Sequence, residues 1–164
     1  MFRVSREIDF CYGHRLLDYP GKCRFLHGHN GRAIIAFESD HLDDRGMVLD
    51  FNEIKQLVSA WIDQALDHRM ILHRDDPVVP ELKRLGEPLL LLDRNPTAEN
   101  IARLILEYAA ARGLPVAEVK LWETPRCSAA YCRGDVAGGT IDYSQVAAAC
   151  SCHPIAPPPE RKIR

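Results

Sequence analysis

The chain has 164 residues, of which 46% are hydrophobic and 27% charged, and its formal net charge at pH 7 is −2. This length suggests one domain that can bury a core without extra cross-links. The small net charge gives no reason to expect nucleic acid or an anionic membrane as the main partner. No apolar run is long enough for a membrane span, and the charged N-terminal segment is unlike a signal peptide, so we expect a cytoplasmic protein.

Two extended segments open the chain. Apolar residues at even positions from Phe2 to Phe10 alternate with charged residues, which predicts a strand over residues 2–12. Residues 27–38, rich in apolar and β-branched side chains, predict a second strand. The turn signal YPGK lies between them, so we expect an antiparallel hairpin with a long connection.

Two helices are predicted in the middle of the chain. Asp50 followed by Glu53 resembles a capping box, and apolar residues then recur at a helical period as far as Leu66. Residues 73–96 contain four prolines and are expected to be loop-rich. The second helix is expected to begin near NPTAEN and to end before the glycine at position 113.

The last regular segments are two strands, at VAEVKLWE and SAAYCR. Because strands and helices do not alternate, the order favours an α+β domain over residues 1–132, with an antiparallel sheet and helices on one face. The composition beyond it predicts an irregular tail over residues 133–164. A small group in this tail could bind a metal, although its spacing is tight for a closed zinc site: Cys150, Cys152 and His153.

Three histidines stand at the ends of the predicted hairpin. His27 and His29 are two residues apart in a strand, so both imidazoles point to one face, and His14 ends the preceding strand, where it can lie opposite them. Three neutral imidazoles can form a zinc site with an open fourth position, which a catalytic metal requires. Gly28, which faces away, permits another chain segment to approach closely. The alternative is that the histidines are ordinary polar residues at a strand start.

One of the six cysteines has a distinctive setting. Cys23 lies between Lys22 and Arg24, and nearby positive charge lowers a thiol pKa and favours the reactive thiolate. The alternative is a simple loop thiol. For most of the other cysteines we expect reduced structural thiols, since a cytoplasmic protein rarely carries a disulfide framework.

Two acidic residues are further candidates for the site. Asp67 precedes His68 just past the first helix, and a carboxylate can orient an imidazole as a general base if a turn holds the two together. The alternative is a helix-terminal histidine beside a solvated aspartate. Glu123 lies on the apolar face of its strand, where it needs either two adjacent N–H donors of a ligand, such as a 2-amino-4-oxopyrimidine ring, or a buried arginine.

Five motifs occur in a fixed order: F-x-x-x-H (Phe10–His14), C-x-x-x-H-G-H (Cys23–His29), LDH (Leu66–His68), PTAEN (Pro96–Asn100) and WET (Trp122–Thr124). Together they resemble the motifs of the 6-pyruvoyltetrahydropterin synthase and 6-carboxytetrahydropterin synthase family over residues 1–132. This resemblance implies a tunnelling fold, in which a four-stranded antiparallel sheet is backed by two helices. It also implies homo-oligomers, trimers or hexamers, with active sites between subunits.

The resemblance also implies roles for residues of the site. Zinc would be held by His14, His27 and His29. Protons would be moved by Cys23, Asp67 and His68, while Glu123 would anchor the pterin ring and Thr97 would lie near it. Five basic residues are candidates for the triphosphate of the substrate: Arg15, Lys22, Arg24, Arg32 and Arg126.

The implied activity is that of a zinc-dependent lyase acting on 7,8-dihydroneopterin triphosphate. By analogy with compact bacterial-type chains, we favour 6-carboxy-5,6,7,8-tetrahydropterin as the product, on the route to queuosine and other deazapurines. The alternative within the family eliminates triphosphate and leaves a pyruvoyl side chain. Alternatives of another class are a non-catalytic, zinc-containing pterin-binding module and a structural zinc protein.

Two positions depart from the family pattern. The first motif reads FCYGH, with Tyr12 near the histidine where small residues are commoner, and Gly31 follows HGHN where many relatives carry an aromatic residue. Both differences touch the pocket lining and leave the proposed metal ligands intact.

Overall fold

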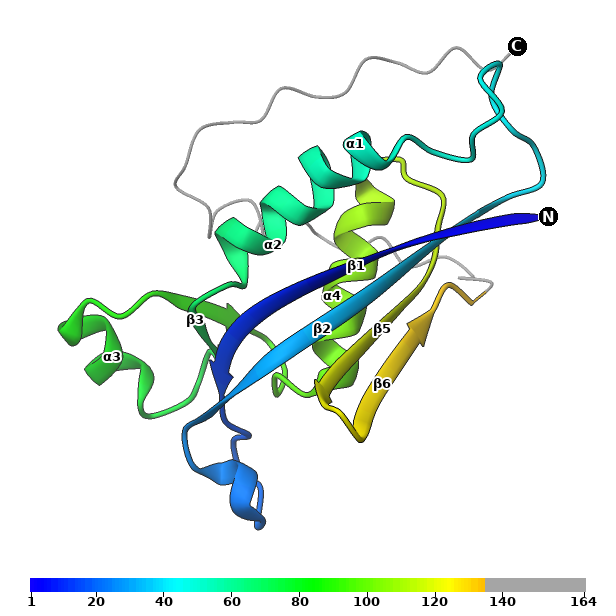
Figure 1. Cartoon of the computed structure of the whole chain (residues 1–164). Coiled ribbons are helices and arrows are strands. Elements are labelled where there is room, and N and C mark those ends of the chain that lie inside the picture. The colour runs from blue at the N-terminus through cyan, green and yellow to red at the C-terminus, as the bar shows by residue number, and fades with distance from the viewer. Residues whose placement is uncertain (135–164) are drawn as a thin grey trace.

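Six strands form one mixed sheet in a computed structural model that describes residues 1–134 (Figure 1). The strand order is β4-β3-β1-β2-β5-β6. β1 pairs with β2, β2 with β5 and β5 with β6 in antiparallel fashion, whereas β3 pairs in parallel with both β1 and β4. The strand bounds are β1 Phe2–His14, β2 His27–Ser39, β3 Arg69–His73, β4 Leu89–Leu92, β5 Val116–Thr124 and β6 Cys127–Cys132.

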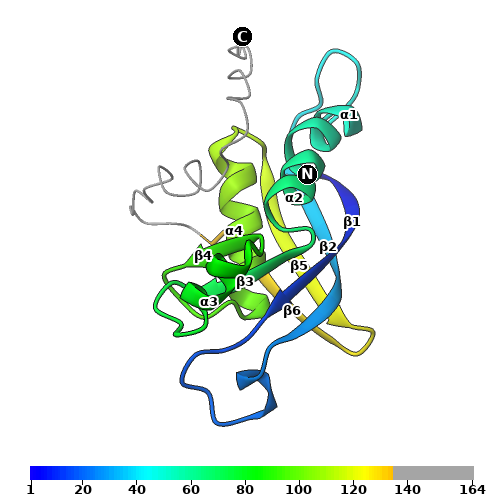
Figure 2. The same ribbon diagram turned by 90° about the vertical axis from the view of Figure 1, so that its left-hand side faces the viewer.

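One long helical segment follows β2 and a second precedes β5. The first consists of α1 (Phe51–Ile54), a π-helical turn (Lys55–Ser59) and α2 (Ala60–Ala65), and the second is α4 (Ala98–Ala111). The carboxylate of Asp50 caps the first by accepting from the backbone N–H of Asn52 at 2.8 Å, which confirms the predicted N-terminus. Both segments cover the same face of the sheet (Figure 2).

The core fills the space between this face and the two helical segments. Side chains from β1, β2 and β5 meet the apolar stripes of the helices, and Trp61 stacks on Tyr108 with ring centroids 4.0 Å apart. Fully burying one such apolar side chain contributes about 1.5–3 kcal/mol. Fully buried examples are Ile35, Phe37, Ile54, Val58, Ile101, Ile105 and Leu121. This shared core joins the sheet and the two helical segments into one packed unit.

The expectation of a four-stranded antiparallel sheet was correct for β1, β2, β5 and β6 but incomplete. The region expected to be loop-rich, residues 73–96, contains β4 and a short helix, α3 (Val79–Leu85), and β3 lies just before it, where no strand was expected. β4 is a run of four leucines between Pro88 and Asp93, and such short apolar runs have no alternation by which a strand can be distinguished from other buried structure. The two short strands extend the sheet beyond β1 and make it mixed.

Two further predictions concern a metal-binding group in the tail and the lack of a membrane span. The predicted tail group of Cys150, Cys152 and His153 lies outside the described residues, as does all of the chain from residue 135. Within residues 1–134, no helix combines the length and the apolarity that a membrane span needs.

Candidate active site

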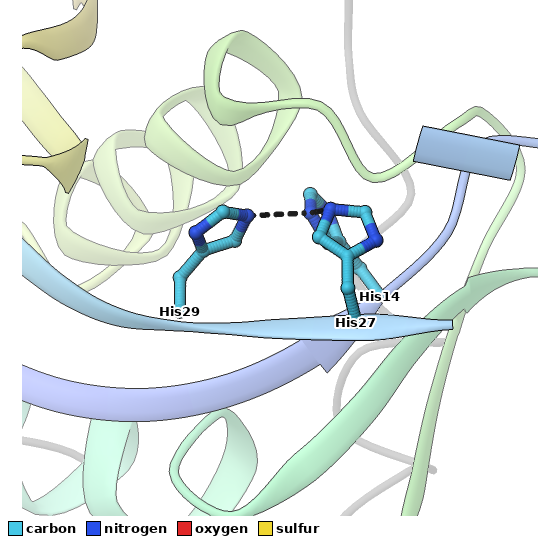
Figure 3. Close-up of side chains that lie close together, drawn as sticks. All are labelled: His14, His27 and His29. Carbon is cyan, nitrogen blue, oxygen red and sulfur yellow. Dashed lines mark hydrogen bonds between the residues drawn. The ribbon is translucent and has the colours of Figure 1, made fainter. Parts of the chain in front are cut away.

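His14, His27 and His29 come together at one end of the β1–β2 hairpin. His14 ends β1 and pairs with His27, the first residue of β2, while His29 lies two residues further along. All three imidazoles rise from the strands toward the side that α4 covers (Figure 3). The Nε2 atom of His14 lies 2.9 Å from that of His27 and 3.1 Å from that of His29. The predicted convergence of the three rings is therefore present.

Backbone carbonyls set the tautomer of two of these rings. The Nδ1 atom of His14 lies 2.7 Å from the carbonyl oxygen of Pro96, and that of His27 lies 2.8 Å from the carbonyl oxygen of Phe25. Since a carbonyl oxygen only accepts, each Nδ1 carries the proton and each Nε2 of the neutral ring presents a lone pair. This is the outer hydrogen bond that metal-binding histidines usually make.

The electrostatics of the cluster favour a bound cation. Burial lowers the pKa of His14, although the Pro96 carbonyl and Glu123 act in the opposite direction, so the ring is neutral near pH 7. With both Nδ1 atoms hydrogen-bonded to carbonyl oxygens, the two Nε2 atoms that face each other at 2.9 Å repel unless a proton or a metal ion lies between them. Nitrogen ligands about 2.0–2.1 Å from a tetrahedral metal are about 3.3 Å apart, close to the separations here. The three histidines thus fit a divalent metal of the kind that imidazole prefers.

Glu123 lies beside this cluster on the same face of the sheet. It follows Val119 and Leu121 at every second position of β5, as the alternation predicted, and its side chain is 22% exposed. Its Oε1 atom accepts a hydrogen bond from the Tyr12 hydroxyl at 2.9 Å and lies 3.9 Å from the Nε2 atom of His14. Sequence reasoning proposed an arginine or a ligand as its partner and missed Tyr12, the nearest donor. Burial, and then Glu123, raise the pKa of Tyr12, which keeps the hydroxyl protonated as a donor.

The PTAEN segment connects the metal cluster to the start of α4. Thr97 is the N-cap residue, and its hydroxyl oxygen accepts from the backbone N–H of Asn100 at 3.4 Å. Asn95 exchanges two hydrogen bonds with the backbone of Leu17, at 2.7 and 2.9 Å. These contacts fix the Pro96 carbonyl that orients His14. The sequence analysis did not identify Asn95, although an Asn-Pro pair before a helix is a recognisable turn signal.

The side chains of Asp67 and His68 form a hydrogen-bonded pair, and not the alternative of a helix-terminal histidine beside a solvated aspartate. The Oδ2 atom of Asp67 lies 2.7 Å from the Nδ1 atom of His68, and its Oδ1 atom accepts from the backbone N–H of Cys11 at 2.7 Å. His68 has a φ of 55°, the left-handed turn that brings adjacent side chains together. Burial alone would raise the pKa of Asp67, but the hydrogen bonds from Cys11 and His68 outweigh it and lower the pKa. Asp67 is therefore an ionised partner that holds the His68 ring.

This pair lies against the other face of the sheet. Cys11 alternates with Tyr12 along β1, and its thiol lies 3.2 Å from the side-chain oxygen of Asn30 on that second face. Asp67 and Cys11 both line a cavity of about 830 Å³ there. His68 borders a neighbouring cavity of about 570 Å³, which extends over Gly13 and Gly28 and also touches His27 and His29, although the imidazoles of these two residues rise toward α4. Within one chain, the Asp67–His68 pair and the three histidines thus lie on opposite faces.

The close approach expected at Gly28 is present. A Cβ atom at this position would lie 3.0 Å from the carbonyl oxygen of Tyr12 on the paired strand. A larger residue would therefore disturb β1 next to His14 and His27.

Cys23 lies in a 3₁₀ turn, Lys22–Arg24, in the connection between β1 and β2. Its side chain is half-buried, and its carbonyl oxygen accepts from the backbone N–H of Leu16 at 2.8 Å. The turn stands at the same end of the hairpin as His14 and His27. The structure thus brings Cys23 to the metal end of the hairpin and leaves Asp67 and His68 across the sheet.

Two of the five candidate triphosphate-binding residues are already paired with carboxylates. The Nε atom of Arg15 lies 2.7 Å from the buried side chain of Asp76, and that of Arg32 lies 3.0 Å from Asp9. Arg24 lies over the ring of Phe25, 4.7 Å from its centroid. These pairs make Arg15 the least available of the candidates, because its partner is buried and cannot turn to water.

Comparison with known proteins identifies the family. Residues 3–134 match the family model described as 6-pyruvoyl tetrahydropterin synthase. The chain belongs to this family. A Rickettsia conorii relative is 38% identical over 134 residues, covering 77% of this chain and 97% of the relative. A Haemophilus influenzae relative is 31% identical over 133 residues, covering 76% and 94%. Both relatives are named 6-carboxy-5,6,7,8-tetrahydropterin synthase.

Solved structures share the fold of this chain. An uncharacterized protein from Wolinella succinogenes superposes with a TM-score of 0.69 at 28% identity, covering 81% of this chain and 98% of that chain. The 6-pyruvoyl tetrahydropterin synthase of Caenorhabditis elegans gives a TM-score of 0.59 at 21% identity, covering 81% and 96%. The second likeness supports the fold alone.

Proposed function

We propose that this chain is a zinc-dependent lyase that converts 7,8-dihydroneopterin triphosphate and water to 6-carboxy-5,6,7,8-tetrahydropterin, acetaldehyde and triphosphate, on the route to queuosine and other deazapurines. The observation that carries the proposal is the cluster of three facing imidazoles beside Glu123. It occurs in a chain whose relatives at more than 30% identity include proteins named for this product.

The residues on the inner face would bind and orient the substrate. His14, His27 and His29 would hold Zn²⁺, which when bound supplies Lewis acidity to the side-chain hydroxyls of the pterin. Glu123 would accept the two adjacent N–H groups of the 2-amino-4-oxo ring, a pairing that fixes both the position and the tilt of the ring. Thr97, which caps α4 next to the carbonyl that orients His14, would lie near the ring.

Proton transfer would fall to Cys23 and to the Asp67–His68 pair. Asp67 holds the Nδ1–H of His68 at 2.7 Å, so the Nε2 atom of that ring is left to take up or release a proton. Cys23, beside Lys22 and Arg24, would act as the thiolate. A non-catalytic pterin-binding module has no use for an ionised carboxylate that holds an exposed imidazole in a strained turn.

The two groups of residues imply a site that is completed between copies of the chain. The metal cluster and the Asp67–His68 pair lie on opposite faces of one sheet, so a single chain does not bring them together. The hairpin connection around Cys23 also exposes three large apolar side chains: Tyr19, Phe25 and Leu26. We propose a homo-oligomer, a trimer or a hexamer, in which a second copy covers this connection and supplies its His68. Residues 1–132 would form the catalytic domain.

A release assay tests the proposed lyase. Zinc-loaded protein is incubated with 7,8-dihydroneopterin triphosphate, and free triphosphate is measured over time, with His27→Ala as the matched control. The proposal requires release by the wild-type protein and none above background by the control. Zinc binding and a cooperative thermal transition without any release would instead support a binding module or a structural zinc protein.

A further inference from the structure

The hydroxyl of Tyr12 is the structural partner of Glu123, and we infer that Tyr12 is a positioning residue that sets the preference of this site for a 2-amino-4-oxo pteridine ring. The inference rests on the proposed function, in which Glu123 binds that ring. It concerns a residue that lies between the metal cluster and the carboxylate and that has no role in holding the metal.

The ring of Tyr12 is buried and packs against both the core and the histidines of the site. It is 3% exposed and stacks on Phe10 with centroids 5.4 Å apart. Its centroid lies 5.3 Å from that of His14, at a near-perpendicular angle, and 5.7 Å from that of His29. Because these neighbours restrict both χ angles, the hydroxyl has a fixed position.

Gly31 leaves the space that the Tyr12 ring occupies. A Cβ atom at position 31 would lie 2.9 Å from Cε1 of Tyr12 and 3.5 Å from Cδ1 of Leu121. A side chain on β2 at this point would therefore displace the aromatic ring on β1. Tyr12 and Gly31 are thus one arrangement in which β1 supplies the aromatic ring and β2 makes room for it.

The fixed hydroxyl in turn fixes the carboxylate. Tyr12 donates to Oε1 of Glu123 at 2.9 Å, whereas His14 lies 3.9 Å from the same oxygen, too far for a hydrogen bond. An ionised carboxylate accepts about four hydrogen bonds, so a partly exposed Glu123 keeps capacity for a ligand on both oxygens. The position of the Tyr12 hydroxyl therefore determines the plane of the Glu123 carboxylate, and with it the directions from which a ligand can donate hydrogen bonds to the two oxygens.

A carboxylate held in one plane discriminates between pteridines. A 2-amino-4-oxo ring offers two adjacent N–H donors, one for each oxygen. A 2,4-dioxo ring offers a carbonyl oxygen in place of the amino group, and that oxygen repels the second carboxylate oxygen. If Glu123 can rotate, it avoids this repulsion, so loss of the Tyr12 hydroxyl should reduce the preference between the two rings.

The test compares Tyr12→Phe with Tyr131→Phe, which removes a hydroxyl from a half-buried tyrosine on β6. Dissociation constants for pterin and for lumazine, its 2,4-dioxo counterpart, are measured by fluorescence on zinc-loaded protein. We expect Tyr12→Phe to lower the preference for pterin over lumazine about tenfold and to leave the zinc content unchanged. In turnover of 7,8-dihydroneopterin triphosphate, we expect the KM of this variant to rise by a larger factor than its kcat falls. Tyr131→Phe should match the wild type. An unchanged preference in Tyr12→Phe overturns the inference.

Two further variants keep the outcomes separate. Gly31→Ala retains the Tyr12 hydroxyl but displaces the Tyr12 ring, so it should lose the preference for pterin over lumazine as Tyr12→Phe does. It provides a second test if Tyr12→Phe is unstable. Glu123→Gln reports on the proposed function itself. If the wild type prefers pterin and Glu123→Gln does not, the role assigned to Glu123 in the proposed function stands, and the Tyr12 comparison alone decides the inference. If neither protein distinguishes the two rings, both the inference and the assigned role of Glu123 are wrong.

Discussion

His14 and Pro96, which are far apart in the sequence, are joined by a hydrogen bond of 2.7 Å between the ring Nδ1 atom and the carbonyl oxygen. This bond ties the end of β1 to the start of α4. It leaves the Nε2 atom of a buried, neutral ring facing two other Nε2 atoms, so the fold itself prepares the site for a metal.

Removal of the metal should therefore abolish the activity without unfolding the core. We expect a strong chelator to take the metal content from about one ion per chain to near zero and to eliminate turnover, with recovery when Zn²⁺ is returned. Elemental analysis and circular dichroism provide the two measurements. Full turnover in metal-free protein would contradict the role of the three histidines.

Replacement of Cys23 by alanine should lower kcat by about 10²–10⁴-fold, the usual range for a group that transfers protons. Metal content should be unchanged, because Cys23 lies in the connection and is not one of the three converging ligands. Cys127→Ala, at an exposed position at the start of β6, is the matched control. Equal rates for the two variants would remove Cys23 from the mechanism.

Mixing two inactive variants tests whether sites form between chains. A site that needs His27 from one chain and His68 from another is intact in about one quarter of random pairings of His27→Ala with His68→Ala chains. Co-expression should therefore restore about one quarter of the wild-type activity. A mixture of Asp67→Ala with His68→Ala should restore none, since both changes affect the same pair. The absence of recovery in the first mixture would indicate that each chain completes its own site.

Asp76 should stabilise the fold in a pH-dependent way. Burial would raise its pKa, but hydrogen bonds from Arg15 and from the Val78 backbone outweigh this and lower the pKa below the ordinary 3.8. A lowered native pKa means that the stabilisation is complete above pH 3.8 and is lost as the pH falls through the native value. At pH 7, Asp76→Asn should reduce the free energy of unfolding by about 1–3 kcal/mol.

Urea unfolding at several pH values measures this effect. The difference between Asp76→Asn and the wild type should shrink below pH 3.8, where the wild-type carboxylate takes up a proton. Asp63→Asn, at an exposed position on α2, should show little difference at any pH. A difference for Asp76→Asn that is constant with pH would show that the carboxylate charge is not the source of its stabilising effect.

Strand alternation predicted much of the site. The even positions of β1 and the odd positions of β2 share a face, so His14, His27 and His29 could be placed together from the sequence, and the same reasoning placed Glu123 on the apolar face of β5. The capping role of Asp50 was likewise readable from its local neighbours. In each case the relevant contact depends on periodicity or on a few adjacent residues.

Contacts that depend on tertiary pairing could not be predicted in this way. The Tyr12–Glu123 hydrogen bond joins residues 111 positions apart and exists because β2 lies between β1 and β5. The Asp67 carboxylate accepts a hydrogen bond from the backbone of Cys11, 56 positions away, because β3 pairs in parallel with β1. The sequence of β3 has no alternation from which this strand could be predicted. Long-range register decides such contacts, and local pattern does not.

The central claim is the identity of the reaction, and mass spectrometry of the pterin products tests it most directly. Purified, zinc-loaded protein is incubated with 7,8-dihydroneopterin triphosphate, and the pterins and any acetaldehyde are quantified together. The account predicts 6-carboxy-5,6,7,8-tetrahydropterin and acetaldehyde in equal amounts. A pyruvoyl tetrahydropterin without acetaldehyde, or unchanged substrate in a protein that retains its zinc, would contradict it.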